Sequence, residues 1–277
     1  MVSVVRFGPA GIPIACHSCS TLDGIEYVSK IGLDAFEVEF VRGVKMGESA
    51  AKEVGEIAKK HGIILSCHAP YWINCCAKEE RKIAMTIRNL FETARAAHAM
   101  GAWVIVFHPG YYMGREPKVC EEITIQTLDK LLAKMKDAGI DDVTLGAETT
   151  GKNSQYGSLD EIISLSRTIK EVVPVIDFAH MHAREGGWIK SEKDYAKIFE
   201  KWSRLKVKRF HSHFSEIEYG KGGEIRHLEL GTNNEPPFKE LAGFLSKNNL
   251  EGTIICETPL LEQDAIKMQK IYRGGGK

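Results

Sequence analysis

The chain has 277 residues, of which 43% are hydrophobic and 27% are charged, so it has enough apolar material for a large core. Its 37 basic and 37 acidic residues cancel. This balance excludes a global attraction to nucleic acid or anionic lipid, and any DNA contact must use a local basic face. No apolar run approaches the ~20 residues of a membrane span, which argues against a membrane protein.

Seven cysteines are present, an odd number, and no signal peptide precedes them. We therefore expect a cytoplasmic protein without a disulfide framework. Cys16 and Cys19 form a CxxC, but a zinc knuckle would need a second such pair. Most of the cysteines are interpreted as small buried residues.

Short β-rich runs alternate with longer amphipathic segments. The predicted strands are one within residues 4–17 and then 38–40, 63–67, 103–107, 143–147, 173–177, 207–212 and 252–256. The predicted helices are 22–31, 48–61, 78–100, 117–138, 159–171, 192–204, 235–247 and 262–272. Ser158 and Glu161 resemble a capping box. The basic run at 201–210 fits a solvated helix end that leads into a strand.

Eight β-α units predict an α/β fold, a single (β/α)₈ TIM barrel, rather than a doubly wound sheet. No linker or break in composition divides the chain, so we expect one domain over residues 1–277. The C-terminal RGGGK predicts a flexible tail from about residue 273.

Histidines and carboxylates occur where the predicted strands end. In a TIM barrel the active site forms at the C-terminal ends of the strands. Any one such residue could be an ordinary polar residue of a loop, but here six strands each supply a possible zinc ligand to the same rim. Six ligands exceed the needs of one catalytic zinc, so we predict two or three ions, an arrangement suited to phosphoryl chemistry. These residues are His68, His108, Glu148, Asp177, His213 and Glu257.

Further histidines surround this set. His180 follows Asp177 by three residues in DFAH, so both can reach one site. His182 is predicted to orient a ligand, with a role as a ligand itself the alternative. His211 and His213 face the same way on a strand, with His211 in the layer beneath. His227 lies in a loop, whereas His61 and His98 are assigned to helices, and nothing specific supports His17.

The motifs in chain order are CHAPYWIN, FHPG, AETT, DFAH, SHF, RHLELG and CETP. Together they resemble the endonuclease IV family of apurinic/apyrimidinic endonucleases, over about residues 34 to 260 and closest to its archaeal-type members. The resemblance implies a xylose isomerase-like barrel. It also implies a zinc-dependent DNA-repair hydrolase that cuts double-stranded DNA on the 5′ side of an abasic site.

The resemblance also implies roles for single residues. His68 and His108 match ligands of one zinc, and Glu148 matches a bridging carboxylate. Asp177, His213 and Glu257 match ligands of a second ion, and His180 and His227 match ligands of a third. Glu148 and Glu257 are taken as the catalytic carboxylates, and Mn or Fe could replace Zn at such ligands.

One position departs from the family pattern. The third-zinc motif of the family reads Asp-Arg-His, and here it reads Ile225-Arg226-His227. Glu224 stands one position too early, and reaching the site requires its side-chain direction to reverse. We therefore expect a third site that is weakly occupied or lost, with rescue by Glu224 as the alternative.

Three residues are candidates for DNA contact. Tyr71 and Trp72 follow His68 in a loop that enters DNA in the family, where an aromatic wedge replaces lost base stacking. The alternative is that both rings pack the loop onto the barrel. Arg42, after the second strand, could probe the duplex in the same way. The expected partner is DNA with abasic sites, bound by a monomer.

Two other functions remain open. A sugar isomerase or epimerase on the same barrel would use a metal to polarise a carbonyl and a carboxylate as base. A degraded member could bind damaged nucleic acid without cutting it. Metal content separates the isomerase from the nuclease, because the isomerase needs one ion and the nuclease needs two or three.

Overall fold

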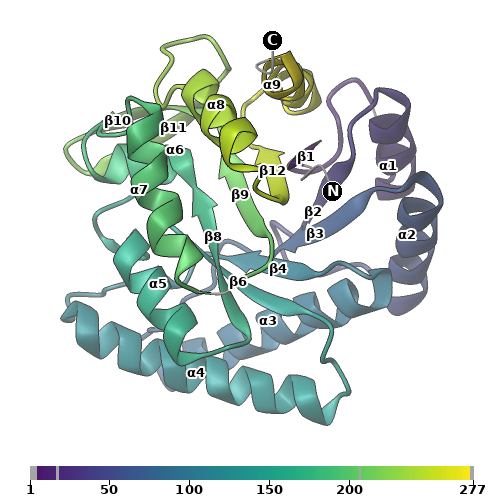
Figure 1. Cartoon of the computed structure of the whole chain (residues 1–277). Helices are drawn as coiled ribbons and strands as arrows, with labels where there is room; N and C mark the ends of the chain where they lie inside the picture. Colours follow the sequence, from purple (N-terminus) through teal and green to yellow (C-terminus); the bar gives the residue numbers. More distant parts are fainter. Residues whose placement is uncertain (1–4, 17–18, 206, 275–277) are drawn as a thin grey trace.

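The computed structural model describes residues 5–16, 19–205 and 207–274. Within them, eight parallel strands pair in the order β1-β12-β9-β8-β6-β4-β3-β2, and the bridge between Ala10 and Glu37 closes the circle (Figure 1). This is the predicted TIM barrel. The barrel strands are β1 (Val5–Pro9), β2 (Ala35–Glu39), β3 (Ile64–His68), β4 (Val104–Phe107), β6 (Thr144–Glu148), β8 (Val172–Asp177), β9 (Phe210–Phe214) and β12 (Gly252–Cys256).

Helices surround these strands (Figure 1). Each buries one apolar stripe against the sheet, as the helical periodicity predicts. No helix in the described part of the chain is long and apolar enough to cross a membrane. The surrounding helices are α1 (Thr21–Lys30), α2 (Glu48–His61), α3 (Glu80–Met100), α4 (Pro117–Asp137), α5 (Leu159–Thr168), α7 (Glu192–Ser203), α8 (Phe238–Asn248) and α9 (Glu262–Gly274).

Local signals account for several helix ends. Ser158 and Glu161 form the predicted capping box at the start of α5. Gly62 ends α2 with φ 69°, a conformation that costs glycine little. At the C-terminus α9 extends to Gly274, so residues 273 and 274 are helical rather than part of the expected tail, whose remaining residues lie outside the described ones.

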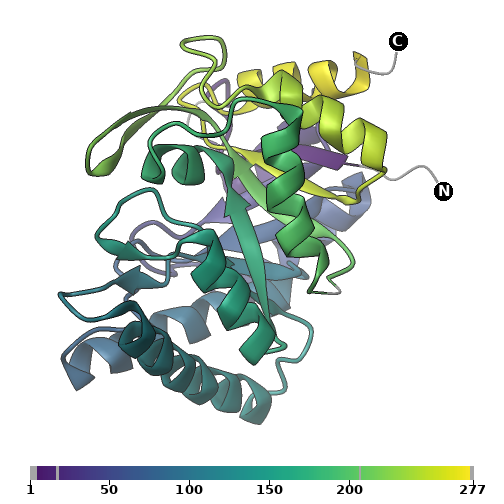
Figure 2. The ribbon, with the colours of Figure 1, turned by 60° about the vertical axis from the view of Figure 1, so that its left-hand side comes forward.

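Extra elements gather over the carboxyl ends of the barrel strands. They are the short helix α6 (Phe178–Arg184) and two small antiparallel pairs, β5 (Gly110–Tyr111) with β7 (Gln155–Tyr156) and β10 (Glu216–Gly220) with β11 (Gly223–Leu228). Figure 2 shows the β10–β11 hairpin projecting from the barrel. The sequence analysis missed all of them because each is too short to show a clear period.

The cysteines follow the prediction in part. Five of them are free and buried: Cys67, Cys75, Cys76, Cys120 and Cys256. Cys16 and Cys19 are joined by a disulfide, a single bridge where no disulfide framework was expected. The amide of Cys19 donates to the carbonyl of Cys16, and their Cα atoms lie 5.5 Å apart, a normal separation for a disulfide.

Candidate metal centre

A cavity of about 790 Å³ opens at the carboxyl ends of the barrel strands. Five of the predicted ligands line it: His68, His108, His180, His227 and Glu257. Glu148, Asp177 and His213 lie fully buried beside them. The structure thus brings all eight predicted ligands to one place, as expected if parallel strands end at a common rim.

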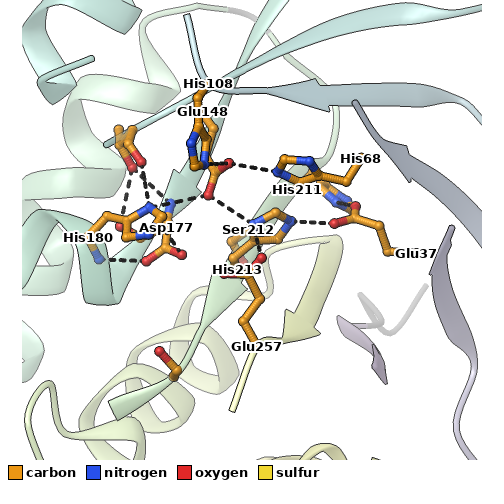
Figure 3. A network of polar contacts seen from close by, with 12 residues as sticks. Glu37, His68, His108, Glu148, Asp177, His180, His211, Ser212, His213 and Glu257 are labelled. Carbon is orange, nitrogen blue, oxygen red and sulfur yellow. Dashed lines mark hydrogen bonds and ion pairs between the residues drawn. The ribbon is translucent and has the colours of Figure 1, made fainter. Parts of the chain in front are cut away.

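Glu148 at the end of β6 is the centre of the cluster (Figure 3). One carboxylate oxygen lies 2.8 Å from His108 Nε2 and 3.3 Å from His68 Nε2. The other lies 3.0 Å from His213 Nδ1 and 3.4 Å from His180 Nδ1. Its two oxygens therefore face different imidazoles, which is the arrangement a bridging carboxylate needs.

The ligand atoms fall into overlapping groups in which all atoms lie within 4.8 Å of one another. Because Glu148, Asp177 and Glu257 each belong to more than one group, the groups form one continuous cluster. Three of the five groups together contain all eight predicted ligands: His68, His108 and Glu148; Glu148, Asp177, His213 and Glu257; and Asp177, His180, His227 and Glu257.

His180 and His227 approach each other through their outer nitrogens, with the two Nε2 atoms 3.3 Å apart. The inner nitrogen of His180 lies 3.0 Å from the Thr149 carbonyl, and that of His227 lies 3.2 Å from the Glu257 carbonyl. A ring whose Nδ1–H donates to a carbonyl keeps its lone pair on Nε2. Two such lone pairs facing each other suit a shared cation.

Glu224 reaches the same place, contrary to the expected direction of its side chain. Its carboxylate lies 3.6 Å from His180 Nε2 and 3.9 Å from His227 Nε2. The pairing of β10 with β11 shifts by one residue, so Tyr219 pairs with Glu224 while Glu218 pairs with Arg226. Ile225 is the extra residue of this bulge, and its side chain is 58% exposed. The bulge lets residues three apart face the same side, which a regular strand does not allow.

Gly151 makes room for this approach. A Cβ atom at this position would lie 2.6 Å from Glu224 Oε2 and 3.0 Å from the His180 ring. The Glu224 amide also donates to the Gly151 carbonyl at 2.9 Å. The loop after β6 thus holds Glu224 against the histidine pair.

The carboxyl groups of the cluster titrate unequally. Burial alone would raise the pKa of Glu148, but His108 and His213 outweigh it and hold that pKa well below its usual value. Burial raises the pKa of Glu257 well above its usual value, and Glu148 adds to the rise while His213 offsets part of it. The neighbouring imidazoles thus outweigh burial at Glu148 but not at Glu257.

A second buried layer lies beneath the cluster, and the sequence analysis found only half of it. His211 is there as predicted, with Nε2 3.0 Å from the carboxylate of Glu37. Glu37, fully buried on β2, also accepts from Ser66 Oγ at 2.6 Å and lies 2.8 Å from His213 Nε2. It was missed because it precedes the strand predicted at 38–40, and only residues after strand ends were considered.

Glu39 is a second acid on β2 that the sequence analysis missed. It lines the cavity, and its Oε1 atom is buried with no hydrogen-bond partner among the described residues. Burial raises its pKa to about 7, with Glu37 adding to the rise and His68 opposing it. The alternation of side chains along β2 could have revealed both acids.

The predicted DNA-contact residues lie at or near the mouth. Tyr71 and Trp72 are 59% and 51% exposed, and Tyr71 lines the cavity. Such exposure does not fit rings that merely pack the loop onto the barrel. Arg42 is exposed but does not line the cavity.

The remaining histidines of the described residues lie apart from the cluster. His17, for which the sequence analysis assigned no role, falls outside the described residues. His182 does not orient a ligand as predicted, because its Nε2 faces Glu235 at 3.4 Å. The short helix α6 turns His182 away from His180, which the amino-acid sequence HMHAR does not reveal. His61 lies 3.8 Å from Glu26, and His98 binds Asp142 at 2.7 Å.

Known proteins resemble this chain in sequence and in fold. Residues 25–273 match the model of the family described as xylose isomerase-like TIM barrel. The chain belongs to this family. An uncharacterized protein of Methanocaldococcus jannaschii is 38% identical over 270 residues, which cover 96% of each chain. A Mycoplasma pneumoniae protein named "Probable endonuclease 4" is 27% identical over 206 residues, covering 72% of this chain and 69% of that protein.

Solved structures of the xylose isomerase-like barrel are similar in fold. Endonuclease IV from Thermus thermophilus superimposes with a TM-score of 0.72 at 17% identity and covers 98% of both chains. A D-tagatose 3-epimerase-like protein gives a TM-score of 0.73 at 20% identity over 96% of both chains. Identities this low show the fold alone, so the choice between the two chemistries depends on the site.

Proposed function

We propose that this protein is a metal-dependent endonuclease that hydrolyses the phosphodiester on the 5′ side of abasic sites in double-stranded DNA. The observation that carries the proposal is that three overlapping ligand groups, joined by Glu148, Asp177 and Glu257, contain all eight predicted ligands. Clusters of two or more metal ions are typical of phosphodiester hydrolysis. The relatives named endonuclease 4 support the same class of reaction.

The donor set fits the ions that the family resemblance implies. Imidazole and carboxylate are ligands for Zn, and also for Mn or Fe. Asp177 Oδ2 is buried with no hydrogen-bond partner among the described residues, as a ligand awaiting a cation would be. His68, His108 and Glu148 would hold one ion; Glu148, Asp177, His213 and Glu257 a second; and Asp177, His180, His227 and Glu257 a third, with Glu224 beside the two histidines.

The bound ions would lower the pKa of a water molecule and stabilise charge on the phosphate oxygens. The protein's own part is positional. Glu148 and Glu257 hold fixed places between imidazoles, so they set where the phosphate can lie. Tyr71 and Trp72 stand exposed at the mouth, where their rings could stack in place of the missing base.

A sugar isomerase or epimerase is the second candidate. Glu148, Asp177, His213 and Glu257 alone could hold a single ion, and the D-tagatose 3-epimerase-like protein shares the fold. The additional ligands His180, His227 and Glu224 are more than a single ion needs, and they favour the nuclease.

The test is incubation of the purified protein with a duplex that carries one abasic site, with and without EDTA. Incision 5′ to the lesion that EDTA abolishes is expected. Elemental analysis of the same preparation should give two or three ions per chain, a count estimated from the ligand groups. One ion per chain and no incision would favour the epimerase.

A further inference from the structure

Glu39 stands at the carboxyl end of β2 and faces the cavity. It lies two residues beyond Glu37, whose carboxylate contacts His211 and His213 inside the barrel. Side chains two residues apart on a strand share a face, so Glu39 points inward as well, one layer nearer the mouth.

Gly11 leaves space for the side chain of Glu39 on one side. Gly11, with φ 94°, faces it, and a Cβ atom there would lie 3.2 Å from Glu39 Cγ. The Gly11 amide donates to the Glu37 carbonyl at 3.0 Å, which fixes the two backbones against each other. No larger residue could adopt this backbone conformation without strain.

Glu39 lines the same cavity as five of the candidate ligands without joining their groups. In the described part of the chain it belongs to no group of ligand atoms that lie within 4.8 Å of one another. Its Oε1 atom is nevertheless buried and without a hydrogen-bond partner there. A buried acceptor without a partner is costly, so such an atom calls for a donor from outside the chain.

We propose that Glu39 is a substrate-binding residue that accepts a hydrogen bond from a sugar hydroxyl in the cavity. This inference rests on the proposed function, because the preferred substrate is taken to be the abasic sugar in DNA. An abasic sugar carries a hydroxyl on C1′, where an intact nucleotide carries its base. A carboxylate that accepts from this hydroxyl would recognise the lesion itself, whereas a carboxylate facing phosphate oxygens would repel them.

The hydroxyl could also belong to a free sugar, which would present the same donor. A site built to bind a hydroxyl rejects an analogue that lacks it, because the buried acceptor is then left unpaired. The two sources are therefore separable by substrates that differ in one hydroxyl or in the presence of DNA.

The experiment compares incision of a duplex with a natural abasic site and of one with a tetrahydrofuran analogue, which lacks the C1′ hydroxyl. The metal-loaded parent is expected to prefer the natural site by roughly ten- to hundredfold in kcat/KM. Glu39→Ala should remove the preference by slowing only the natural substrate, and Glu39→Gln, which keeps an acceptor oxygen, should retain part of it.

Glu53→Gln on the exposed surface of α2 is the matched control and should behave as the parent. In a second arm, calorimetry measures D-fructose binding to the same metal-loaded proteins. A parent that does not cut DNA but binds D-fructose, with binding lost in Glu39→Ala, supports Glu39 while refuting the nuclease.

Three results overturn the proposal. The first is a parent that cuts both duplexes equally, with Glu39→Ala unchanged. The second is loss of a bound metal ion in Glu39→Ala, which would make Glu39 a ligand. The third is a parent that neither cuts the abasic duplex nor binds D-fructose.

Discussion

The Nε2 atoms of His180 and His227 face each other at 3.3 Å, and Glu224 stands beside both. If these three side chains hold an ion, Glu224→Ala should lower the zinc content of the loaded protein by about one ion per chain. Elemental analysis after gel filtration measures it. Ile225→Ala, which removes only the exposed bulge side chain, is the control, and equal zinc in both variants would mean that Glu224 binds no metal.

Glu148 and Glu257 are expected to be essential for incision. Glu148→Gln and Glu257→Gln keep the side-chain shape but remove a charge that faces the imidazoles. Each should lower the incision rate by roughly 10²-fold or more while circular dichroism stays unchanged. A variant with near-parental rate and full metal content would remove that residue from the site.

The exposed rings of Tyr71 and Trp72 are expected to contribute to DNA binding. Replacing both by alanine should weaken binding to an abasic duplex by about 1–3 kcal/mol per lost stack, with metal content unchanged. Fluorescence anisotropy with a labelled duplex measures the affinity. Met85→Ala alters an exposed apolar residue on α3 and serves as the control. Equal affinities for all three proteins would leave the rings without a role in binding.

Glu37 is expected to position His213. It lies 2.8 Å from His213 Nε2 on the side away from the cluster, and a carboxylate behind a metal-binding imidazole orients the ring and raises its basicity. Glu37→Gln should weaken metal binding by about 10- to 100-fold in a chelator competition.

The control for Glu37 is Ser66→Ala. This variant removes the hydroxyl that donates to Glu37 but keeps the carboxylate. It should lower the melting temperature with little change in metal affinity. If the two variants lose stability equally and both keep parental affinity, Glu37 is a structural residue only.

Lys152 is expected to attract the phosphate of the substrate. It lines the cavity together with His180 and Glu224. Lys152→Ala should weaken DNA binding and reduce the slope of log K against log salt by about one phosphate contact. Lys152→Arg should restore the slope, and Lys60→Ala at the far end of α2 should not change it. An unaltered slope in Lys152→Ala would favour an uncharged substrate.

The sequence by itself determined the barrel and pointed to most of its candidate ligands. Apolar residues that recur with the helical period placed α2 at residues 48–61, as observed. A helix that buries one face must carry its apolar residues at that period. His68, Glu148 and Asp177 were recognisable because strand ends in a parallel barrel share one rim, a rule that needs no coordinates. Glu37 and Glu39 were recognisable in principle from the alternation along β2, although only the structure drew attention to them.

Only the tertiary structure decided which neighbours those residues have. The direction of Glu224 depends on a one-residue bulge, and a bulge is a property of two paired strands, so no pattern within β11 alone reveals it. His182 likewise faces Glu235 rather than the cluster because α6 follows β8 at an angle set by packing. Strand periodicity fixes which residues share a face, whereas the pairing of distant segments fixes what that face meets.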